Sequence, residues 1–477
     1  MNGVDNIRYT VHKTRLDNLT GKSYNSEQTV NVYTVLEKEH PTMKTTVKSA
    51  PFRAVMDRPR PEHKKPKKPA LFWRILIRLL TVFGMAGTGF KLETEGMEKI
   101  AKGEPCLILM NHSCFLDMQI AYRALFPRAF CIVCTSDAFV GLGGLMNWVM
   151  RQIGCIPTQK FVTDVSLIKD MTYALKEMDT SILMYPEASY SFDGRCTALP
   201  RKMGVLLKKL DVPVLMIETF GAFSRNPLYN ELQVRKNVKV SAKLRCLYTR
   251  EEIKEKSVQE LSDGLDEAFS FDHFKWQKEQ GLLINDDFRA DGLSRILYKC
   301  AACGTEGKME GKGTELHCHH CGKTYTLMPL GNLKAKQGET EFSHIPDWSD
   351  WQRKCVRQEI LEGSYKLDVE VDIAMMVDFS AIYKVGSGRL THDLNGFHLT
   401  GCDGQLDYRQ KPLNCYSLYA DYYWYEIGDV ICIGDSQRLY YCFPKGDVPV
   451  AKARMATEEL YKIKRSQRRR KKVLASE

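Results

Sequence analysis

A histidine and an aspartate five positions apart, His112 and Asp117, are the residues of this sequence with the clearest capacity for acid–base chemistry. They lie in the stretch CLILMNHSCFLD, where five apolar residues end abruptly at an asparagine. This pattern predicts a buried strand that emerges at a sheet edge, where side chains can meet a substrate. A carboxylate bonded to one ring nitrogen fixes the histidine tautomer and leaves the other nitrogen free to accept a proton from a hydroxyl. We therefore interpret His112 as a general base that Asp117 orients.

The spacing alone does not establish this role, because the sequence contains the same pattern twice more, at His12/Asp17 and His398/Asp403. Only the copy described above follows an apolar run and precedes a segment, residues 115–125, with the apolar spacing of a helix. A histidine on the strand-to-helix turn can meet a carboxylate that lies about one turn into the helix. A histidine that only caps or packs at a turn is the alternative that these residues leave open.

The length and charge of the chain predict several domains and two basic segments. A chain of 477 residues exceeds one hydrophobic core, so we expect two to four domains, and an apolar content of 44% suffices for globular cores. Residues 53–68 contain seven basic and two acidic residues, and residues 462–472 contain eight basic and no acidic ones. The rest of the chain is therefore near neutral. Such segments suit an anionic surface, either membrane or nucleic acid, with solvated tails as the alternative.

Cysteine usage favours a reducing environment. The first seventy residues are polar and charged and lack the apolar core of a signal peptide. Outside one metal-like cluster, most of the sixteen cysteines lie in apolar runs, as Cys106 and Cys432 do. We therefore expect free thiols and a location at the cytoplasmic face of a membrane.

The beginning of the chain predicts an arm followed by a membrane-interface helix. Residues 1–70 have few apolar residues in any clear period and end in RPRPEHKKPKKP, so we expect a flexible basic arm. Residues 71–90 are apolar except for Arg74 and Arg78, and the uncharged run after Arg78 covers only twelve residues. Because about twenty are needed to cross a bilayer, we expect a helix that lies in the interface. A buried core helix is the alternative.

Residues 71–285 are predicted to form an α/β domain that begins with this helix, because apolar runs alternate with helical patterns after residue 91. Two further polar sites follow the ends of predicted elements: GCIPTQK ends in Lys160, and YPEASYSFDG contains Glu187. A base, a carboxylate and a cation at one sheet edge are what an active site in such a fold requires. The predicted strands are residues 106–110, 130–134, 182–185, 213–218 and 238–247, and a last long helix should begin at Thr249 with a capping box.

Together these stretches resemble the glycerolipid acyltransferases, the family of the lysophosphatidate acyltransferases, in four blocks that follow in order over roughly residues 75–220. NHSCFLD resembles the first block, NHx4D, and GCIPTQK the second, GxIFIDR, with lysine in place of arginine. YPEASYSFDGR with LPRKMG resembles the third, FPEGTRS followed by PFKxG, and DVPVLMI the fourth. The resemblance implies a mixed-sheet α/β fold and an enzyme that moves an acyl group from acyl-CoA or acyl-carrier protein to a lysophospholipid hydroxyl. The leading acceptor is 1-acylglycerol-3-phosphate.

The resemblance also implies roles for site residues. His112 would deprotonate the hydroxyl while Asp117 holds the imidazole, Glu187 would help to shape the acceptor site, and Lys160 would pair with an acceptor phosphate as a point charge. The arginine of the third block is Tyr190 here. Either the acceptor has no phosphate group near Tyr190, or a neighbouring arginine or lysine supplies the positive charge that the family arginine would provide. The further candidates for substrate binding are Asn111, Ser189, Arg195, Arg201 and Lys202.

Residues 296–330 carry two CxxC pairs, which predict a zinc ribbon with a structural zinc ion. The pairs are fourteen residues apart, a spacing that suits one tetrahedral zinc site with no open position. Free thiols are the alternative, and three nearby histidines have poor geometry to replace a cysteine. The predicted ligands are Cys300, Cys303, Cys318 and Cys321.

The C-terminal third predicts a separate β-rich domain. Residues 345–465 contain an amphipathic helix, successive strands divided by Gly, Asp and Asn turns, and a closing helix, and residues 466–477 read as a basic tail. Several antiparallel strands capped by one helix resemble a pleckstrin-homology-like domain, although a small β-barrel or sandwich is nearly as good an interpretation. An inactive, acyltransferase-like lipid-binding scaffold is the alternative function. A nucleic-acid-binding role would leave the four blocks unexplained.

Overall fold

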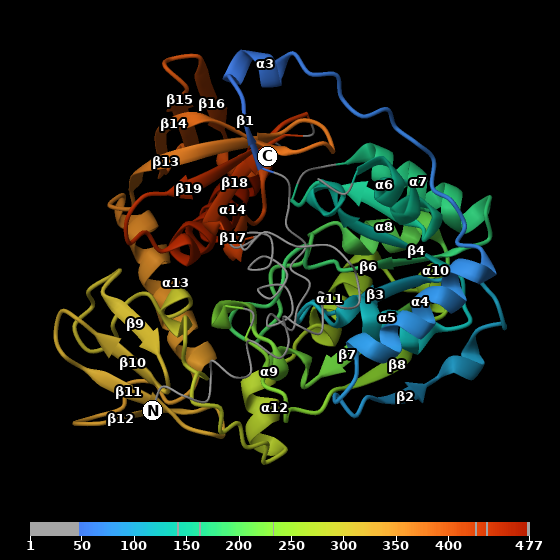
Figure 1. The fold of residues 1–477 in the computed structure, drawn as a ribbon, viewed down its shortest axis with the longest axis horizontal. Coiled ribbons are helices and arrows are strands. Elements are labelled where there is room, and N and C mark those ends of the chain that lie inside the picture. Colours follow the sequence, from blue (N-terminus) through green and yellow to red (C-terminus); the bar gives the residue numbers. More distant parts are fainter. Residues whose placement is uncertain are drawn as a thin grey trace, which may run out of the picture. The chain divides into compact units, whose positions relative to one another are not determined.

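The computed structural model describes residues 47–140, 143–161, 164–231, 233–424, 427–435 and 437–474 (Figure 1). All of them belong to one compact unit, residues 45–477. Within these ranges the chain forms three sheets. No helix in the described part of the chain is long and apolar enough to cross a membrane.

A seven-stranded mixed sheet forms the first part of the fold, as the sequence predicts. The strands pair in parallel except β7 and β8, which are antiparallel. In spatial order they are β2 (Lys91–Glu95), β8 (Ser241–Tyr248), β7 (Val214–Phe220), β3 (Leu107–Met110), β6 (Ser181–Met184), β4 (Phe130–Thr135) and β5 (Cys155–Thr158). The five predicted strands are present, whereas β2 and β5 were missed. β2 is exposed along its length, and β5 has only four residues and contains a proline, so neither has the apolar run of a buried strand.

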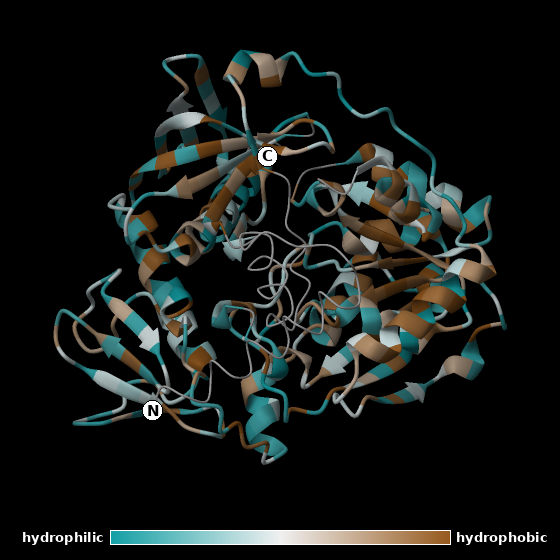
Figure 2. Cartoon of the chain, viewed as in Figure 1, coloured by the Kyte–Doolittle hydropathy of each residue, from teal (hydrophilic) through white to brown (hydrophobic). Residues whose placement is uncertain are grey.

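Strand β3 is buried on both faces, and its side chains alternate between two hydrophobic cores. Ile108 and Met110 pack with Ile120 of α5 (Asp117–Leu125) in one core. Leu107 and Leu109 lie in the other. Hydrophobic residues concentrate along the central strands of this sheet (Figure 2). The helices that contribute to the second core are α7 (Val165–Lys176), α8 (Met203–Leu210), α10 (Arg250–Glu255) and α11 (Val258–Ala268).

The last helix of this part is divided, which corrects the prediction of one long helix from Thr249. The predicted capping box is present, because the Thr249 hydroxyl accepts a hydrogen bond from the Glu252 amide and the Glu252 carboxylate accepts one from the Thr249 amide. Ser257 and Glu260 form a second capping box that begins α11. Serine at a cap competes with the helical backbone, so the chain breaks there. The remaining elements are α4 (Leu71–Gly84), α6 (Gly143–Gln152), α9 (Ala222–Arg225) and α12 (His273–Glu279).

Residues 47–70 do not form a flexible arm. β1 (Val47–Ser49) pairs with β14 of the C-terminal sheet, and the helix α3 (Phe52–Met56) buries Phe52 and Val55 in the core of that sheet. The extended segment that follows lies along the seven-stranded part, where His63 contacts Asp170 at 2.9 Å (Figure 1). The partners lie far along the chain, so local composition gave no signal of them. The rest of the predicted arm, residues 1–46, lies outside the described residues.

The ribbon segment folds as a four-stranded antiparallel sheet. Its order is β12-β11-β10-β9, from β9 (Met309–Lys312), β10 (Glu315–Cys318), β11 (Thr324–Leu327) and β12 (Leu333–Ala335). Helix α13 (Ile345–Glu362) follows and buries Trp348 against this sheet, where its ring lies 4.9 Å from that of Tyr325. The indole nitrogen of Trp348 donates to the carbonyl oxygen of Lys299.

The C-terminal strands form one antiparallel sheet with the order β16-β15-β14-β13-β19-β18-β17, and β1 adds to β14. The closing helix α14 (Val450–Leu474) continues far beyond residue 465, so the predicted basic tail is largely helical. The pleckstrin-homology-like interpretation stays a prediction. The strands are β13 (Leu367–Met376), β14 (Ile382–Asp393), β15 (Gly396–Gly401), β16 (Leu406–Gln410), β17 (Tyr419–Trp424), β18 (Gly428–Gly434) and β19 (Leu439–Pro444).

Candidate active site

The turn between β3 and α5 brings His112 and Asp117 into direct contact. β3 ends at Met110, and Asp117 is the first residue of α5. The Nδ1 atom of His112 lies 2.8 Å from Oδ2 of Asp117. The same oxygen accepts hydrogen bonds from the backbone amides of Ser113 at 2.6 Å and Cys114 at 3.1 Å, so the carboxylate is fixed at the start of the helix. No described residue bonds to Nε2, which leaves this nitrogen free to accept a proton.

Burial sets the charge of this pair. Desolvation lowers the pKa of His112, and the bond to Asp117 opposes that effect without cancelling it. Desolvation raises the pKa of Asp117, while its contacts with His112 and with two backbone amides lower it. We conclude that the imidazole is neutral near pH 7, which is the state that a general base requires.

Two tyrosines enclose the ring of His112. Tyr185 stacks on it with ring centroids 4.1 Å apart, and Tyr190 lies 3.8 Å away. Phe115 contacts Tyr190 with centroids 5.2 Å apart. Tyr190, at the position of the family arginine, therefore lies directly beside the imidazole. Tyr185 was missed, because its place after the strand SILM does not reveal which side chain it contacts.

Asn111 connects the ends of two neighbouring strands. Its Oδ1 accepts hydrogen bonds from the amide of Thr219 at 2.8 Å and from the hydroxyl of Thr219 at 3.2 Å. Its Nδ2 donates to Oγ of Ser113 at 3.0 Å. Asn111 is completely buried. These contacts position the turn that carries the histidine.

Glu187 also acts on the backbone of this turn. Its Oε1 accepts from the amide of His112 at 3.0 Å, and its Oε2 accepts from the amide of Thr197 at 2.8 Å. Burial raises its pKa to about 7, although the two amides oppose this shift. Ser189 is buried nearby, and its hydroxyl lies 3.4 Å from the carbonyl oxygen of Tyr190. The glutamate thus fixes the position of the histidine backbone.

The predicted cations are distributed over different places. Lys160 is close enough to lower the pKa of His112, and its Nζ lies 4.0 Å from the ring centre of Tyr419 in the C-terminal sheet. Arg195 instead donates to Asp350 of α13 at 2.7 Å and to Asp193 at 3.1 Å, so this arrangement gives no support to a phosphate role. Arg201 and Lys202 are exposed beside α8.

Part of the chain that includes His112, Asp117, Lys160 and Glu187 is similar to known proteins. Residues 91–217 match the family described as Acyltransferase. Two curated relatives are 1-acyl-sn-glycerol-3-phosphate acyltransferases. BAT2 of Brassica napus is 25% identical to this chain, and the match covers 30% of this chain and 41% of BAT2. The mouse alpha form is 24% identical, and the match covers 30% of this chain and 50% of that protein. This segment is a glycerolipid acyltransferase domain.

The chain spans between 39% and 50% of the length of three curated relatives that it matches. Among solved structures, the 1-acyl-sn-glycerophosphate acyltransferase PlsC from Thermotoga maritima is 18% identical, with a TM-score of 0.32. The match covers 41% of this chain and 76% of that one.

Next to the acyltransferase domain, the four predicted cysteines form a compact cluster that could hold a metal ion. Their sulfur atoms lie within 4.8 Å of one another. Those of Cys300 and Cys321 are 3.8 Å apart, and those of Cys303 and Cys318 are 3.9 Å apart. Four thiolates bound tetrahedrally at about 2.3 Å would be about 3.8 Å apart, so the donor set fits such an ion. Two of the neighbouring histidines have other partners: His317 contacts the Thr324 hydroxyl at 2.8 Å, and His319 contacts Glu310 at 2.9 Å.

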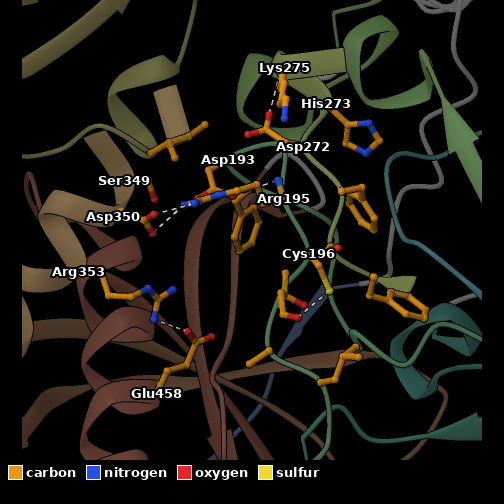
Figure 3. Close-up of a pocket in the computed structure, with 18 of the residues that line it drawn as sticks. Asp193, Arg195, Cys196, Asp272, His273, Lys275, Ser349, Asp350, Arg353 and Glu458 are labelled. Carbon is orange, nitrogen blue, oxygen red and sulfur yellow. Dashed lines mark hydrogen bonds and ion pairs between the residues drawn. The ribbon is translucent and has the colours of Figure 1, made fainter. Parts of the chain in front are cut away.

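A cleft of about 850 Å³ lies between the acyltransferase domain and helices α13 and α14 (Figure 3). Its lining includes Thr219 and His273 but not His112. Oγ1 of Thr219 lies 2.9 Å from Oγ of Ser113, and Nε2 of His273 lies 3.4 Å from it. Two residues that line the cleft therefore contact Ser113, the residue next to His112. Sequence patterns did not reveal the cleft, because its walls come from segments more than 150 residues apart.

Proposed function

We propose that the protein is an O-acyltransferase that moves a fatty acyl group from acyl-CoA or acyl-carrier protein to the hydroxyl of a lysophospholipid, with 1-acylglycerol-3-phosphate as the leading acceptor. The observation that carries the proposal is the 2.8 Å contact between Nδ1 of His112 and Asp117, with no described residue bonded to Nε2. The names of the curated relatives support the choice of acceptor.

In the proposed reaction, Nε2 of His112 accepts the proton of the acceptor hydroxyl as its oxygen attacks the thioester carbonyl. The tetrahedral intermediate then expels the thiolate, and the imidazolium returns the proton to that sulfur. Asp117 holds the ring and stabilises its positive charge. General base catalysis of this kind contributes about two to four orders of magnitude in rate.

The test is acyl transfer by the purified protein. It is incubated with labelled acyl-CoA or acyl-carrier protein and with lysophosphatidate, other lysolipids or glycerol 3-phosphate. We expect His112→Ala to abolish transfer and His398→Ala to retain it, because His398 bonds Asp407 on the C-terminal sheet instead. Absence of transfer with every pair, or equal rates for the His112→Ala variant, would contradict the enzyme.

The second candidate is an inactive lipid-binding scaffold with the acyltransferase fold. It is favoured by Tyr190, which stands at the place of the family arginine and whose tilted ring lies 3.8 Å from that of His112. Lipid binding without acyl transfer, unaffected by His112→Ala, would support the scaffold. Transfer that depends on His112 would exclude it.

We further propose that the protein binds the anionic, cytoplasmic face of a membrane. Helix α4 supports this, because Phe72 is 66% and Phe83 80% exposed. Trp73 of α4 lies 5.8 Å from Trp148 of α6, a helix on which Leu145 is 78% exposed. Two neighbouring helices thus present apolar side chains, as an interface-bound surface requires. The exposed arginines of α14, including Arg468, Arg469 and Arg470, add positive charge.

Vesicle flotation tests this surface. Replacing Phe72 and Phe83 by serine should reduce flotation with anionic vesicles, whereas Leu361→Ser, at an equally apolar residue that is 60% exposed on α13, should not. Binding of the wild type should weaken as salt rises. Equal flotation of all three proteins would contradict the assignment.

We also propose that the cysteine cluster holds a structural zinc ion, because four thiolates close the coordination sphere and leave no position for a substrate. Metal analysis of the purified protein should find one zinc per chain. Another metal, or none, would contradict the proposal.

A further inference from the structure

One face of strand β17 in the C-terminal sheet packs against the acyltransferase domain. Tyr419 shares a hydrophobic core with Val140 and Phe161 of that domain, whereas Ala420 lies in another core. Residues 419–421 pair with β18 in regular register. Because side chains alternate along a strand, Asp421 lies on the same face as Tyr419. The face of β17 that carries these two residues is therefore turned toward the acyltransferase domain.

Lys160, the cation of the second sequence block, lies against this face of β17. Its Nζ atom is 4.0 Å from the ring centre of Tyr419. The Tyr419 hydroxyl donates to Asp137 at 2.5 Å and accepts from the indole nitrogen of Trp424 at 2.9 Å, so the ring is held in place. Nζ of Lys160 has no hydrogen-bond or ion-pair partner in the described part of the chain, and the residue is partly exposed. Its three donors are therefore available to a ligand.

Asp421 adds a negative charge to the surroundings of Lys160. It is only 9% exposed, and its Oδ1 accepts from the amide of Tyr422 at 3.0 Å. No cation among the described residues forms an ion pair with it. Burial raises its pKa to about 6, while the charge of Lys160 opposes this shift. The carboxylate is therefore ionised in most molecules near pH 8.

The two charges lie close to the imidazole of His112. Burial lowers the pKa of His112, and Lys160 adds to that effect. Burial raises the pKa of Tyr190, and the charges of Asp117 and Asp421 add to that shift. The ring of Tyr190 lies 3.8 Å from that of His112. Lys160 and Asp421 therefore both act on the place where the acceptor hydroxyl would meet the base.

We propose that Asp421 is a specificity-determining residue of the acceptor site, where its negative charge beside Lys160 lowers the preference for a phosphate monoester over a zwitterionic lysophospholipid headgroup. A phosphate monoester carries about two negative charges near pH 8. A phosphocholine headgroup instead joins a singly charged phosphodiester to a positive ammonium. Lys160 attracts the phosphate of both, whereas Asp421 repels the monoester more strongly and attracts the ammonium. This inference rests on the proposed function, because it places the acceptor headgroup at Lys160.

Isothermal titration of the full chain without an acyl donor tests the inference. The probes are a short-chain lysophosphatidate and a lysophosphatidylcholine with the same acyl chain, each below its micelle concentration, near pH 8 and at constant ionic strength. Asp421→Asn should raise the ratio of lysophosphatidate affinity to lysophosphatidylcholine affinity about threefold or more, because one like charge is removed. Asparagine keeps an oxygen for the amide of Tyr422. Lys160→Met should weaken the binding of both lysolipids.

The matched control is Asp407→Asn, which removes the same charge from an exposed residue of β16 that contacts His398 instead. It should leave the affinity ratio within about 1.5-fold of the wild type, because exposed charges are screened. An equal rise in the Asp407→Asn and Asp421→Asn variants would indicate general charge attraction and would overturn the inference.

Three further results would also overturn the inference. They are an unchanged or lower ratio in Asp421→Asn, unchanged affinities in Lys160→Met, and absence of binding of both lysolipids to the wild type. If Asp421→Asn does not fold, as thermal unfolding would show, Asp421→Ser takes its place with the same expected rise. Because no acyl donor is present, the titration is independent of catalysis. Absence of acyl transfer with normal ratios would contradict the enzyme alone, and transfer with an unchanged ratio would contradict the role of Asp421 alone.

Discussion

The turn that carries His112 and the strand that carries His398 have the same spacing of histidine and aspartate, but only in the turn do the two side chains meet. On β15, His398 bonds Asp407 of the neighbouring strand at 3.0 Å, and Asp407 is 64% exposed. Asp403 lies beyond the strand, in a turn with a φ of +54°. In the turn that carries His112, Asp117 begins a helix, and the chain reversal returns its carboxylate to the imidazole. Whether the chain turns into a helix or continues along a strand after the histidine therefore decides whether the histidine and aspartate side chains meet.

The largest expected effect is on the rate of acyl transfer, which substitution of Asp117 should lower and substitution of Asp403 should not. Asp117→Asn should lower the rate of acyl transfer about 10²- to 10⁴-fold, because the amide no longer selects the productive tautomer or stabilises the imidazolium. Asp403→Asn should leave the rate within about twofold, since no described hydrogen bond joins it to a histidine. Steady-state kinetics with matched protein preparations measure both. Similar losses in the two variants would show that the pairing in the turn has no catalytic meaning.

The second prediction uses pH to follow the buried histidine. A base with a lowered pKa stays neutral to lower pH, so kcat/KM should remain constant down to a break below the ordinary value of 6.5. Below that break the rate should fall about tenfold per pH unit. Because Asp117 raises the pKa of His112, Asp117→Asn should move the break to still lower pH.

Two observations would contradict this assignment. One is a break above pH 6.5 in the wild type, which would require the charged imidazole to be favoured by its surroundings. The other is an upward shift in the Asp117→Asn variant. NMR titration of the ring protons of His112 gives the same answer without substrate.

The two regions also show which features could be predicted from the sequence. The apolar run before Asn111 and the helical spacing after it are local, so the strand, the turn and the His112–Asp117 pair were predictable. The contacts of Glu187 were not, because its partners are backbone amides, one of them 75 residues away, and any residue type supplies an amide. Sequence likewise could not show that Tyr185 stacks on the imidazole.

Distance along the chain explains the larger errors as well. The polar composition of residues 47–70 suggested a free arm, but its partners β14 and Asp170 lie far away in sequence. The CxxC pairs were predictable because their geometry is set within a few residues of each cysteine pair. Arg454 has a local partner in Glu458, one turn further along α14, but its contact with Phe192 could not be predicted, because Phe192 lies far away in sequence.

The third prediction compares how two asparagines, one in each region, contribute to the free energy of unfolding. Asn111→Ala should lower the free energy of unfolding by about 1–3 kcal/mol, because it leaves the amide and hydroxyl of Thr219 without their buried acceptor. Asn395→Ala, at an exposed position of the β14–β15 hairpin, should change it by less than about 0.5 kcal/mol. Urea denaturation followed by circular dichroism measures both. Equal, small losses of unfolding free energy in the two variants would mean that the hydrogen bonds between Asn111 of the turn and Thr219 of β7 do not hold the turn.

The smallest expected effect belongs to the pair on the C-terminal sheet. The contact between His398 and Asp407 is partly exposed, and the histidine carries a charge only when protonated, so His398→Ala should cost less than about 1 kcal/mol at neutral pH. Urea denaturation measures the cost. A loss well above 1 kcal/mol would show that His398 contributes by packing, and the contrast with the buried pair at His112 would then rest on burial alone.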